Sequence, residues 1–231
     1  MKAWALFFTE PVSYADGLRI QEAIHTARQK DIIPDTVLFL QHTPVITLGR
    51  RGRTQHLLLQ KEELAKRGVE LYESSRGGDV TYHGPGQLVM YPIIRIGTNG
   101  PDSHGYLHNL EETAIRTAST FGVEAWRREG KSGAWTDKGK IAAIGFKLQR
   151  WVSMHGMSFN VEEDLAGFQM IVPCGLIGEP IASFRGLLHE KCPTIAETAR
   201  VMSSHFEDVC DRQFERFEFG GNMPDELAAL V

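Results

Sequence analysis

Apolar residues recur at every third or fourth position in several stretches of the chain, and this spacing predicts amphipathic helices. The stretch over 104–121 has the clearest period, and Gly122 directly after it is typical of a helix C-terminus. Thr194 and Glu197 have the spacing of a capping box at the start of another helix. The helices that we expect cover residues 14–30, 61–67, 104–121 and 194–206.

Short apolar runs lie between these helices and predict strands. Asp137, Lys138 and Gly139 give a turn signal within one of the longer runs. The expected strands cover residues 3–8, 36–41, 45–48, 69–72, 88–91, 123–126, 133–149 and 151–161. Helices alternate with hairpin-like pairs of strands and not with single parallel strands. The pattern therefore predicts an α/β (α+β) fold with a mixed, largely antiparallel sheet flanked by helices.

The chain shows no linker, internal repeat or low-complexity segment, and its 231 residues are enough for a substantial core. We therefore expect a single domain over 1–231. A small C-terminal lobe after about residue 161 is the alternative. A long irregular segment is expected to end near Pro193, and the tail after Phe219 is expected to be loosely held.

Composition restricts the classes of function. The formal net charge of -4 lacks the basic bias of a nucleic-acid-binding protein. No apolar run approaches the ~18 residues of a membrane span. The three cysteines, Cys174, Cys192 and Cys210, form no C-x-x-C pair, so the sequence indicates neither a zinc site nor a thioredoxin-type site. An odd count without a disulfide framework fits a reducing cytoplasm.

The segment from Arg76 to Gln87, R-G-G-D-V-T-Y-H-G-P-G-Q, holds four glycines, a proline, an arginine and a histidine between two strand-like runs. Glycine lets a backbone take positive φ or approach a ligand closely. We therefore interpret this segment, which we call the glycine loop, as a binding loop. An elaborate turn is the competing interpretation, since glycine and proline are the commonest turn residues.

Two later residues have the chemistry of a reactive site. Cys174 sits between a proline and a glycine at the end of an apolar run, and such a turn would present its side chain to a cleft. A buried small hydrophobe is the alternative. A nucleophilic cysteine needs a partner that stabilises its thiolate, and His83, His155 and Lys140 are available. Lys140 leads into an apolar strand, a pattern also shown by lysines that discourage aggregation at strand edges.

Three segments together resemble the lipoate-biosynthesis octanoyltransferase family, the lipoyl(octanoyl) transferases. They are R-G-G-D-V-T-Y-H-G-P-G-Q-L-V-M-Y-P (76–92), then G-K-I-A-A-I-G (139–145) with R-W-V-S-M-H-G (150–156), and finally I-V-P-C-G (171–175). They occur in the family's order and at familiar spacing, within a resemblance that covers roughly Pro44 to Arg200. The three segments together are more specific than any one of them.

The resemblance implies a fold related to biotin and lipoate protein ligases, whose sheet forms the floor of an acyl-binding tunnel. It also implies that Cys174 is the nucleophile and that Lys140 holds it as a thiolate. His83 and His155 would orient the substrate or a loop, and no metal is expected because no third ligand is evident. The substrate-binding residues that the resemblance implies are Arg76, Gly77, Gly78, Asp79, Val80, Thr81, Tyr82, His83, Ala143, Ile144, Gly145, His155, Gly156, Met157 and Ser158.

The implied activity is that of an octanoyl-[acyl carrier protein]:protein N-octanoyltransferase. The donor would be octanoyl-acyl carrier protein, and the acceptors would be lysines of lipoyl domains of 2-oxoacid dehydrogenase complexes and of the glycine-cleavage carrier protein. No ATP or other cofactor is expected, because transfer from a thioester to an amide is downhill. We expect a cytoplasmic monomer without nucleic-acid or membrane partners. A docking surface for the acidic partner proteins is expected from Arg50, Arg51, Arg53 and Arg76.

Two other classes of function fit the same segments. An ATP-dependent lipoate or biotin protein ligase on this fold would activate a free acid and would need no nucleophilic cysteine. A non-catalytic acyl-binding module would tolerate replacement of both Cys174 and Lys140. A cysteine hydrolase fits less well, because the enzyme must favour an amine over water.

Overall fold

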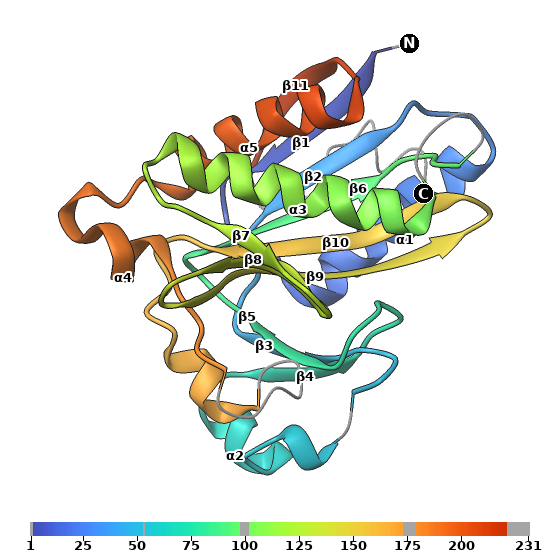
Figure 1. Cartoon of the computed structure of the whole chain (residues 1–231). Coiled ribbons are helices and arrows are strands. Elements are labelled where there is room, and N and C mark those ends of the chain that lie inside the picture. Colours follow the sequence, from blue (N-terminus) through green and yellow to red (C-terminus); the bar gives the residue numbers. More distant parts are fainter. Residues whose placement is uncertain (1, 53, 98–101, 173–178, 221–231) are drawn as a thin grey trace.

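The computed structural model describes residues 2–52, 54–97, 102–172 and 179–220, and all structural statements below concern these residues. Among them, eight strands form one large sheet in the order β11-β1-β2-β6-β10-β9-β8-β7 (Figure 1). β1 runs parallel to both of its neighbours, and the other pairings are antiparallel. The strands are β1 Ala3–Phe8, β2 Thr36–Leu40, β6 Gln87–Ile93, β7 Trp126–Arg128, β8 Lys131–Thr136, β9 Gly139–Gln149, β10 Val152–Asn160 and β11 Phe214–Phe219. The mixed, largely antiparallel sheet is thereby confirmed.

Helices cover both faces of this sheet. α3 and α5 pack against each other on one face, and α1 packs on the other (Figure 1). In the central strand β2, Val37 and Phe39 face α3 and α5, whereas Leu38 and Leu40 face α1. Apart from Thr36, this strand is apolar, because both of its faces are buried. The helices are α1 Tyr14–Gln29, α2 Lys61–Lys66, α3 Ser103–Thr120, α4 Phe184–Leu188 and α5 Ile195–Cys210.

A second sheet of three strands, in the order β4-β3-β5, lies below the large sheet in Figure 1, next to α2. Side chains alternate between its two faces. Ile46 and Tyr82 lie on the face that packs against Phe168 in a separate hydrophobic cluster. Thr81 and His83 lie on the opposite face and line a pocket between the two sheets. The strands are β3 Val45–Leu48, β4 Glu70–Glu73 and β5 Val80–His83.

The observed elements depart from the expected ones at several places. The glycine loop, expected to be irregular, contains β5. The expected strand over 133–149 divides at its turn into β8 and β9, and the strand expected over 123–126 begins only at Trp126. β11 was not predicted, because its charged residues lie among phenylalanines and its strand character depends on pairing with β1.

The region after residue 161 is partly regular. In the segment expected to be irregular, the described residues form α4 and two short 3₁₀ helices, η2 Ala166–Met170 and η4 His189–Lys191. α5 and β11 belong to the layers of the large sheet, and the division of the chain into domains stays a prediction. Most of the tail, 221–231, lies outside the described residues. None of the described helices is both long and apolar enough to pass through a membrane.

Candidate functional site

A cavity of about 140 Å³ opens between the large sheet and the small sheet. It brings together residues from the glycine loop, from β9 and β10, and from the turn between β7 and β8. The side chains and backbone that line it belong to Arg51, Arg76, Gly78, Asp79, Val80, Thr81, His83, Tyr91, Gly130, Lys131, Ser132, Lys140, Ala143, Ile144, Gly145, Gly156, Met157 and Ser158. Residues that are far apart in the sequence therefore share one site.

Two glycines shape the large-sheet side of this cavity. Gly145 of β9 and Gly156 of β10 lie directly opposite each other in the sheet register, so this patch of the sheet carries no side chains. The glycine loop lies against it, and the Gly77 N–H donates to the carbonyl of Phe146 over 3.0 Å. A Cβ atom at Gly145 would lie 2.6 Å from the Gly77 carbonyl oxygen. The close approach of the loop to the sheet therefore requires glycine at this position.

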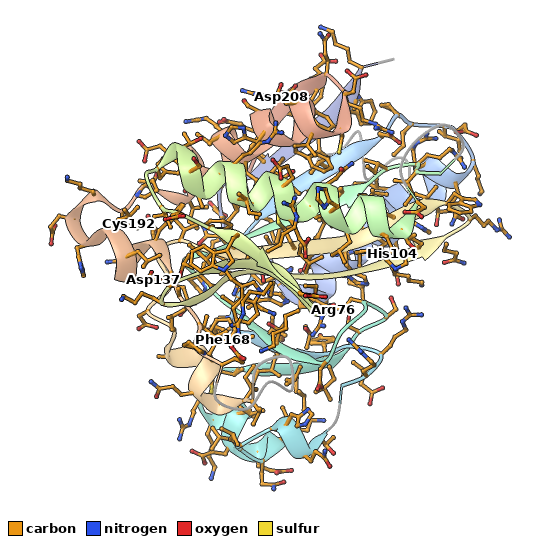
Figure 2. The ribbon with its side chains drawn as sticks, viewed as in Figure 1. Arg76, His104, Asp137, Phe168, Cys192 and Asp208 are labelled. Atoms are coloured by element: carbon orange, nitrogen blue, oxygen red, sulfur yellow. The ribbon has the colours of Figure 1, made fainter. Side chains whose placement is uncertain are left out.

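Arg76 holds the glycine loop in shape. Figure 2 shows this residue between the two sheets, where it is 8 % exposed. Its guanidinium donates to the carbonyls of Thr47 and Asp79, both over 2.7 Å, and to the carbonyl of Gly77 over 3.0 Å. Two further bonds reach the Thr47 hydroxyl. A planar guanidinium with five donors is suited to fixing several carbonyls at once.

The expectation that Arg76 belongs to a docking surface is wrong, since its charge is buried and directed at the chain's own backbone. Of the other three arginines in that expectation, Arg50 and Arg51 are exposed, and Arg51 also lines the cavity. Arg53 lies outside the described residues.

His83 presents a neutral imidazole to the cavity. Its Nδ1 lies 2.6 Å from the Gln87 side-chain oxygen, and the Gln87 amide group donates to Asn160 over 2.9 Å. The Gln87 oxygen must therefore accept, so His83 carries its proton on Nδ1 and has a lone pair on Nε2. Burial, together with the neighbouring His42, lowers the pKa of His83 well below its ordinary value. The ring is thus an uncharged hydrogen-bond acceptor at neutral pH.

His42, which the sequence analysis did not single out, lies behind His83. The two ring centroids are 5.7 Å apart. Its Nδ1 lies 3.0 Å from the Val12 carbonyl oxygen, and its Nε2 lies 2.8 Å from the Tyr91 hydroxyl. The Val12 carbonyl can only accept, so Nδ1 donates and the Tyr91 hydroxyl donates to Nε2. Burial lowers the pKa of His42 to about 4, which keeps this ring neutral as well.

Three of the expected substrate-binding residues do not line the cavity. Tyr82 points to the opposite face of β5, where its ring packs edge-on against Phe168 at 5.8 Å. His155 is buried beside Ser75, with Nε2 3.2 Å from the hydroxyl, and burial lowers its pKa to about 3. Gly77, near the start of the loop, lies against β9, where its N–H donates to the Phe146 carbonyl. Adjacent residues of a strand point to opposite faces, so Tyr82 and His83 point in opposite directions. The sequence analysis did not show this, because it did not predict that β5 is a strand.

Other residues of the cavity were missed. Tyr91 lies in the segment that carries the family resemblance, so its position could have been found there. Gly130, Lys131 and Ser132 approach from the β7–β8 turn, which had no sequence signal for a site. Arg51 was placed in a docking surface but not in the cavity wall. These residues reach the site only through the pairing of β8 with β9 and the position of the small sheet.

Lys140 lies at the edge of the cavity and is 5 % exposed. Its ammonium is 4.7 Å from the centroid of the Trp135 ring. Its backbone N–H donates to the Pro180 carbonyl over 2.9 Å, and its carbonyl accepts from the Ala182 N–H over 3.0 Å. The chain that follows residue 178 is therefore paired directly with Lys140.

Cys174 itself lies among residues 173–178, outside the described residues. The chain before that segment is fixed by the Val172 N–H, which donates to the His56 carbonyl over 2.8 Å. The His56 ring in turn has its Nδ1 2.7 Å from a carboxylate oxygen of Asp79, in the glycine loop. One flank of the segment thus adjoins the glycine loop and the other adjoins Lys140. The contact of Cys174 with Lys140 stays a prediction.

The other two cysteines lack the setting of a nucleophile. Neither lines the cavity. Burial raises the pKa of the Cys192 thiol and raises that of Cys210 to about 12, so both are held as thiols. In the described part of the chain, no three or more His, Cys, Asp or Glu side chains come together as a metal site.

Comparisons with known proteins identify relatives of this chain. Residues 13–207 match the model of the lipoyl protein ligase A/B catalytic domain. The octanoyltransferase of Caldicellulosiruptor saccharolyticus is 45 % identical over 186 residues, which cover 80 % of this chain and 79 % of that protein. The octanoyltransferase of Geobacter metallireducens is 41 % identical over 207 residues, which cover 90 % and 93 % of the two chains.

Solved structures of low sequence identity share the fold. Lipoate-protein ligase A bound with ATP has a TM-score of 0.81 at 15 % identity, covering 100 % of this chain and 92 % of that one. The bipartite lipoate protein ligase of Thermoplasma acidophilum has a TM-score of 0.76 at 14 % identity, covering 100 % and 91 %. The relationship expected from the three motifs is confirmed: the chain belongs to the family of the lipoyl protein ligase A/B catalytic domain.

Proposed function

We propose that this protein transfers an octanoyl group from octanoyl-acyl carrier protein to a specific lysine of lipoyl domains or of the glycine-cleavage carrier protein, through a thioester on Cys174. The observation that supports it most is the single cavity in which Lys140, the glycine loop and the β9–β10 floor meet. The relatives named octanoyltransferase, at 41–45 % identity over most of the chain, support the same acyl group and reaction.

In the first half-reaction, the Cys174 thiolate attacks the carbonyl carbon of the donor thioester. A new carbon–sulfur bond forms, the old one breaks, and the phosphopantetheine thiol leaves with a proton from the Lys140 ammonium. The two thioesters are nearly equal in free energy, so this exchange needs no external energy source. Lys140 is left as a neutral amine.

In the second half-reaction, the neutral amine of the acceptor lysine attacks the acyl-cysteine. The carbon–nitrogen bond of the amide forms, and Cys174 leaves as a thiolate. Lys140 takes the proton that the attacking nitrogen loses and returns to its ammonium form. The cycle closes with the thiolate–ammonium pair restored. Amide formation from a thioester is downhill, so no ATP enters the proposed cycle.

The glycine loop has two proposed tasks. The first is to cover the acyl chain and its carbonyl. The second is to supply a backbone N–H to the tetrahedral oxyanion, for which Gly78 is our candidate because it lines the cavity with a positive φ of 89°. Gly145 is the second candidate donor. The neutral His83 is proposed to accept a hydrogen bond from the acceptor amine and so orient it.

The β9–β10 floor suits an alkyl chain. Ala143 and Ser158 lie opposite each other in the sheet register, two residues along each strand from the Gly145–Gly156 pair. These four small residues leave room above the sheet. An octanoyl chain that buries its methylenes there gains roughly 5 kcal/mol, at about 0.8 kcal/mol per methylene. The specific acyl length, the choice of acceptor, a monomeric state and a cytoplasmic location stay predictions.

Intact-protein mass spectrometry after mixing with octanoyl-acyl carrier protein tests the proposal. The wild-type protein is expected to gain one octanoyl mass that hydroxylamine removes, and Cys174→Ala is expected to gain none. Transfer to a lipoyl domain without any adduct would refute the acyl-cysteine intermediate. Activity only with free octanoate and ATP would assign the protein to the ligase class, and acyl binding that survives loss of both Cys174 and Lys140 would indicate a binding module.

A further inference from the structure

We propose that Trp135 is a positioning residue that holds the Lys140 ammonium at the edge of the cavity by its indole face. This inference rests on the proposed function, because it gives Trp135 a task only if Lys140 acts on the acyl transfer. The Lys140 nitrogen is 4.7 Å from the centroid of the Trp135 ring, within the range of a cation–π contact.

The sheet register produces this contact. Trp135 of β8 lies directly opposite Lys140 of β9. Gly133, two residues earlier, lies beside the lysine stem, since a Cβ there would be in van der Waals contact with the Lys140 Cδ at 3.5 Å. The indole is itself fixed, because it is 0 % exposed and its N–H donates to the Lys131 carbonyl over 3.2 Å. A rigid aromatic surface thus lies beneath a flexible side chain.

The same ring has two other cations near it. The Arg128 guanidinium lies 4.4 Å from the centroid and the Lys131 ammonium 5.9 Å. Both are paired with the carboxylate of Glu179, which follows the Cys174 segment. Glu179 therefore offsets the positive charge that these two residues bring to the ring. Lys140 is the member of this group whose ammonium the proposed reaction uses, and it lies on the cavity together with Lys131.

The physical reason for such a device is the length of the lysine side chain. A four-carbon stem has many rotamers, whereas proton transfer requires the nitrogen to stay within hydrogen-bond reach of the reacting sulfur. A contact with an aromatic face restrains the ammonium, and the ring itself neither takes up nor releases a proton. In its ammonium form, Lys140 is thereby held in place when it gives its proton to the leaving thiol.

Fluorinated tryptophans at position 135 test this directly, because they weaken the cation–π attraction and keep the shape of the ring. We would incorporate mono-, di- and trifluorotryptophan at this position alone and measure the single-turnover rate of octanoyl-Cys174 formation. The rate is expected to fall stepwise, reaching about a tenfold loss, while the Tm and the donor KM stay unchanged. Equal rates across the series would overturn the inference.

Conventional variants provide the controls. Trp135→Tyr and Trp135→Phe keep an aromatic face and should retain more activity than Trp135→Leu at matched Tm. Arg128→Met removes the nearest cation to the ring without touching Lys140 and should leave the acylation rate within about twofold of wild type. If the unmodified protein itself formed no octanoyl-Cys174, the proposed function would fail and this inference with it. If the wild-type protein forms octanoyl-Cys174 normally but fluorination of Trp135 does not change the rate, only this inference fails and the proposed function stands.

Discussion

The large-sheet wall of the cavity carries Ala143, Gly145, Gly156 and Ser158, whereas the small-sheet wall carries buried polar groups that include Arg76. The first wall obtains its shape from missing side chains, and a Cβ added at Gly145 would meet the glycine loop. The second obtains its shape from hydrogen bonds, and any lost donor leaves backbone carbonyls unpaired. From this comparison we propose that an alkyl chain binds against the first wall and that the polar reaction centre lies toward the second.

Lys140 lies on the large-sheet wall, although its ammonium belongs to the polar reaction centre. We expect removal of this ammonium to have the largest effect of the substitutions proposed for the two walls. Lys140→Met keeps the length of the side chain and removes the ammonium. Formation of octanoyl-Cys174 should slow by about a thousandfold, because the leaving thiol loses its proton donor. Lys147→Met on the same strand is the matched control, since Lys147 does not line the cavity. An unchanged rate in Lys140→Met would remove Lys140 from the reaction.

Arg76→Met tests the polar wall. Three backbone carbonyls and the Thr47 hydroxyl would lose their donor in a buried site. The free energy of unfolding, measured in urea, should fall by about 3 kcal/mol. Arg67→Met, at an exposed ion pair with Glu63, should change it by less than about 0.5 kcal/mol. Equal effects of the two substitutions would contradict the structural role of Arg76.

Gly145→Ala tests the other wall. The new Cβ would lie 2.6 Å from the Gly77 carbonyl oxygen, so the glycine loop would have to move away from the sheet. A shift of this kind should reduce the rate of acylation by about a hundredfold, because the carbonyl and its oxyanion donor separate. Gly186→Ala, whose nearest neighbour would be the Ser183 hydroxyl at 3.6 Å, should retain wild-type activity. A Gly145→Ala enzyme with the normal rate would show that the loop does not depend on this approach.

The buried histidines behind the polar wall predict a loss of stability in acid. The pKa of His42 is lowered from 6.5 to about 4, so the folded state favours the neutral ring. The free energy of unfolding that this preference contributes is fully present above pH 6.5 and decreases as the pH falls toward 4. The loss is about 2 kcal/mol at pH 5. Urea unfolding between pH 4.5 and 7.5 would measure it. His42→Gln should flatten this dependence, and an equally steep curve in the variant would exclude His42 as its source.

Much of the fold follows from local patterns. The helices α1, α2, α3 and α5 were predicted to within four residues, because a period of 3.6 and a cap such as Thr194 with Glu197 are features of neighbouring residues. The short helix α4 was not predicted. Most of the strands between them were also predicted, because short apolar runs are likewise a feature of neighbouring residues. β11 was not found, because Phe214–Phe219 is an edge strand whose order depends on parallel pairing with β1, more than 200 residues away in the chain.

The candidate site was likewise predictable only in part. The motifs around Arg76, Lys140 and Cys174 identified the family, because these residues are adjacent to recognisable glycine patterns in the chain. The roles of these residues in acyl transfer stay predictions. The motifs gave no information about which side each residue faces. Within one motif, His83 enters the cavity, Tyr82 packs in a separate core, and Arg76 braces the backbone.

By itself, then, the sequence determined most of the elements, the class of fold and the family, since each of these depends on short-range periods and motifs. Only the tertiary structure decided that Gly145 and Gly156 form one bare patch, that Trp135 lies beneath Lys140, and that the flanks of the Cys174 segment adjoin Lys140 and the glycine loop. These pairings depend on strand register across the sheet. Register is fixed by the packing of whole faces and by turns, and a local pattern does not contain it.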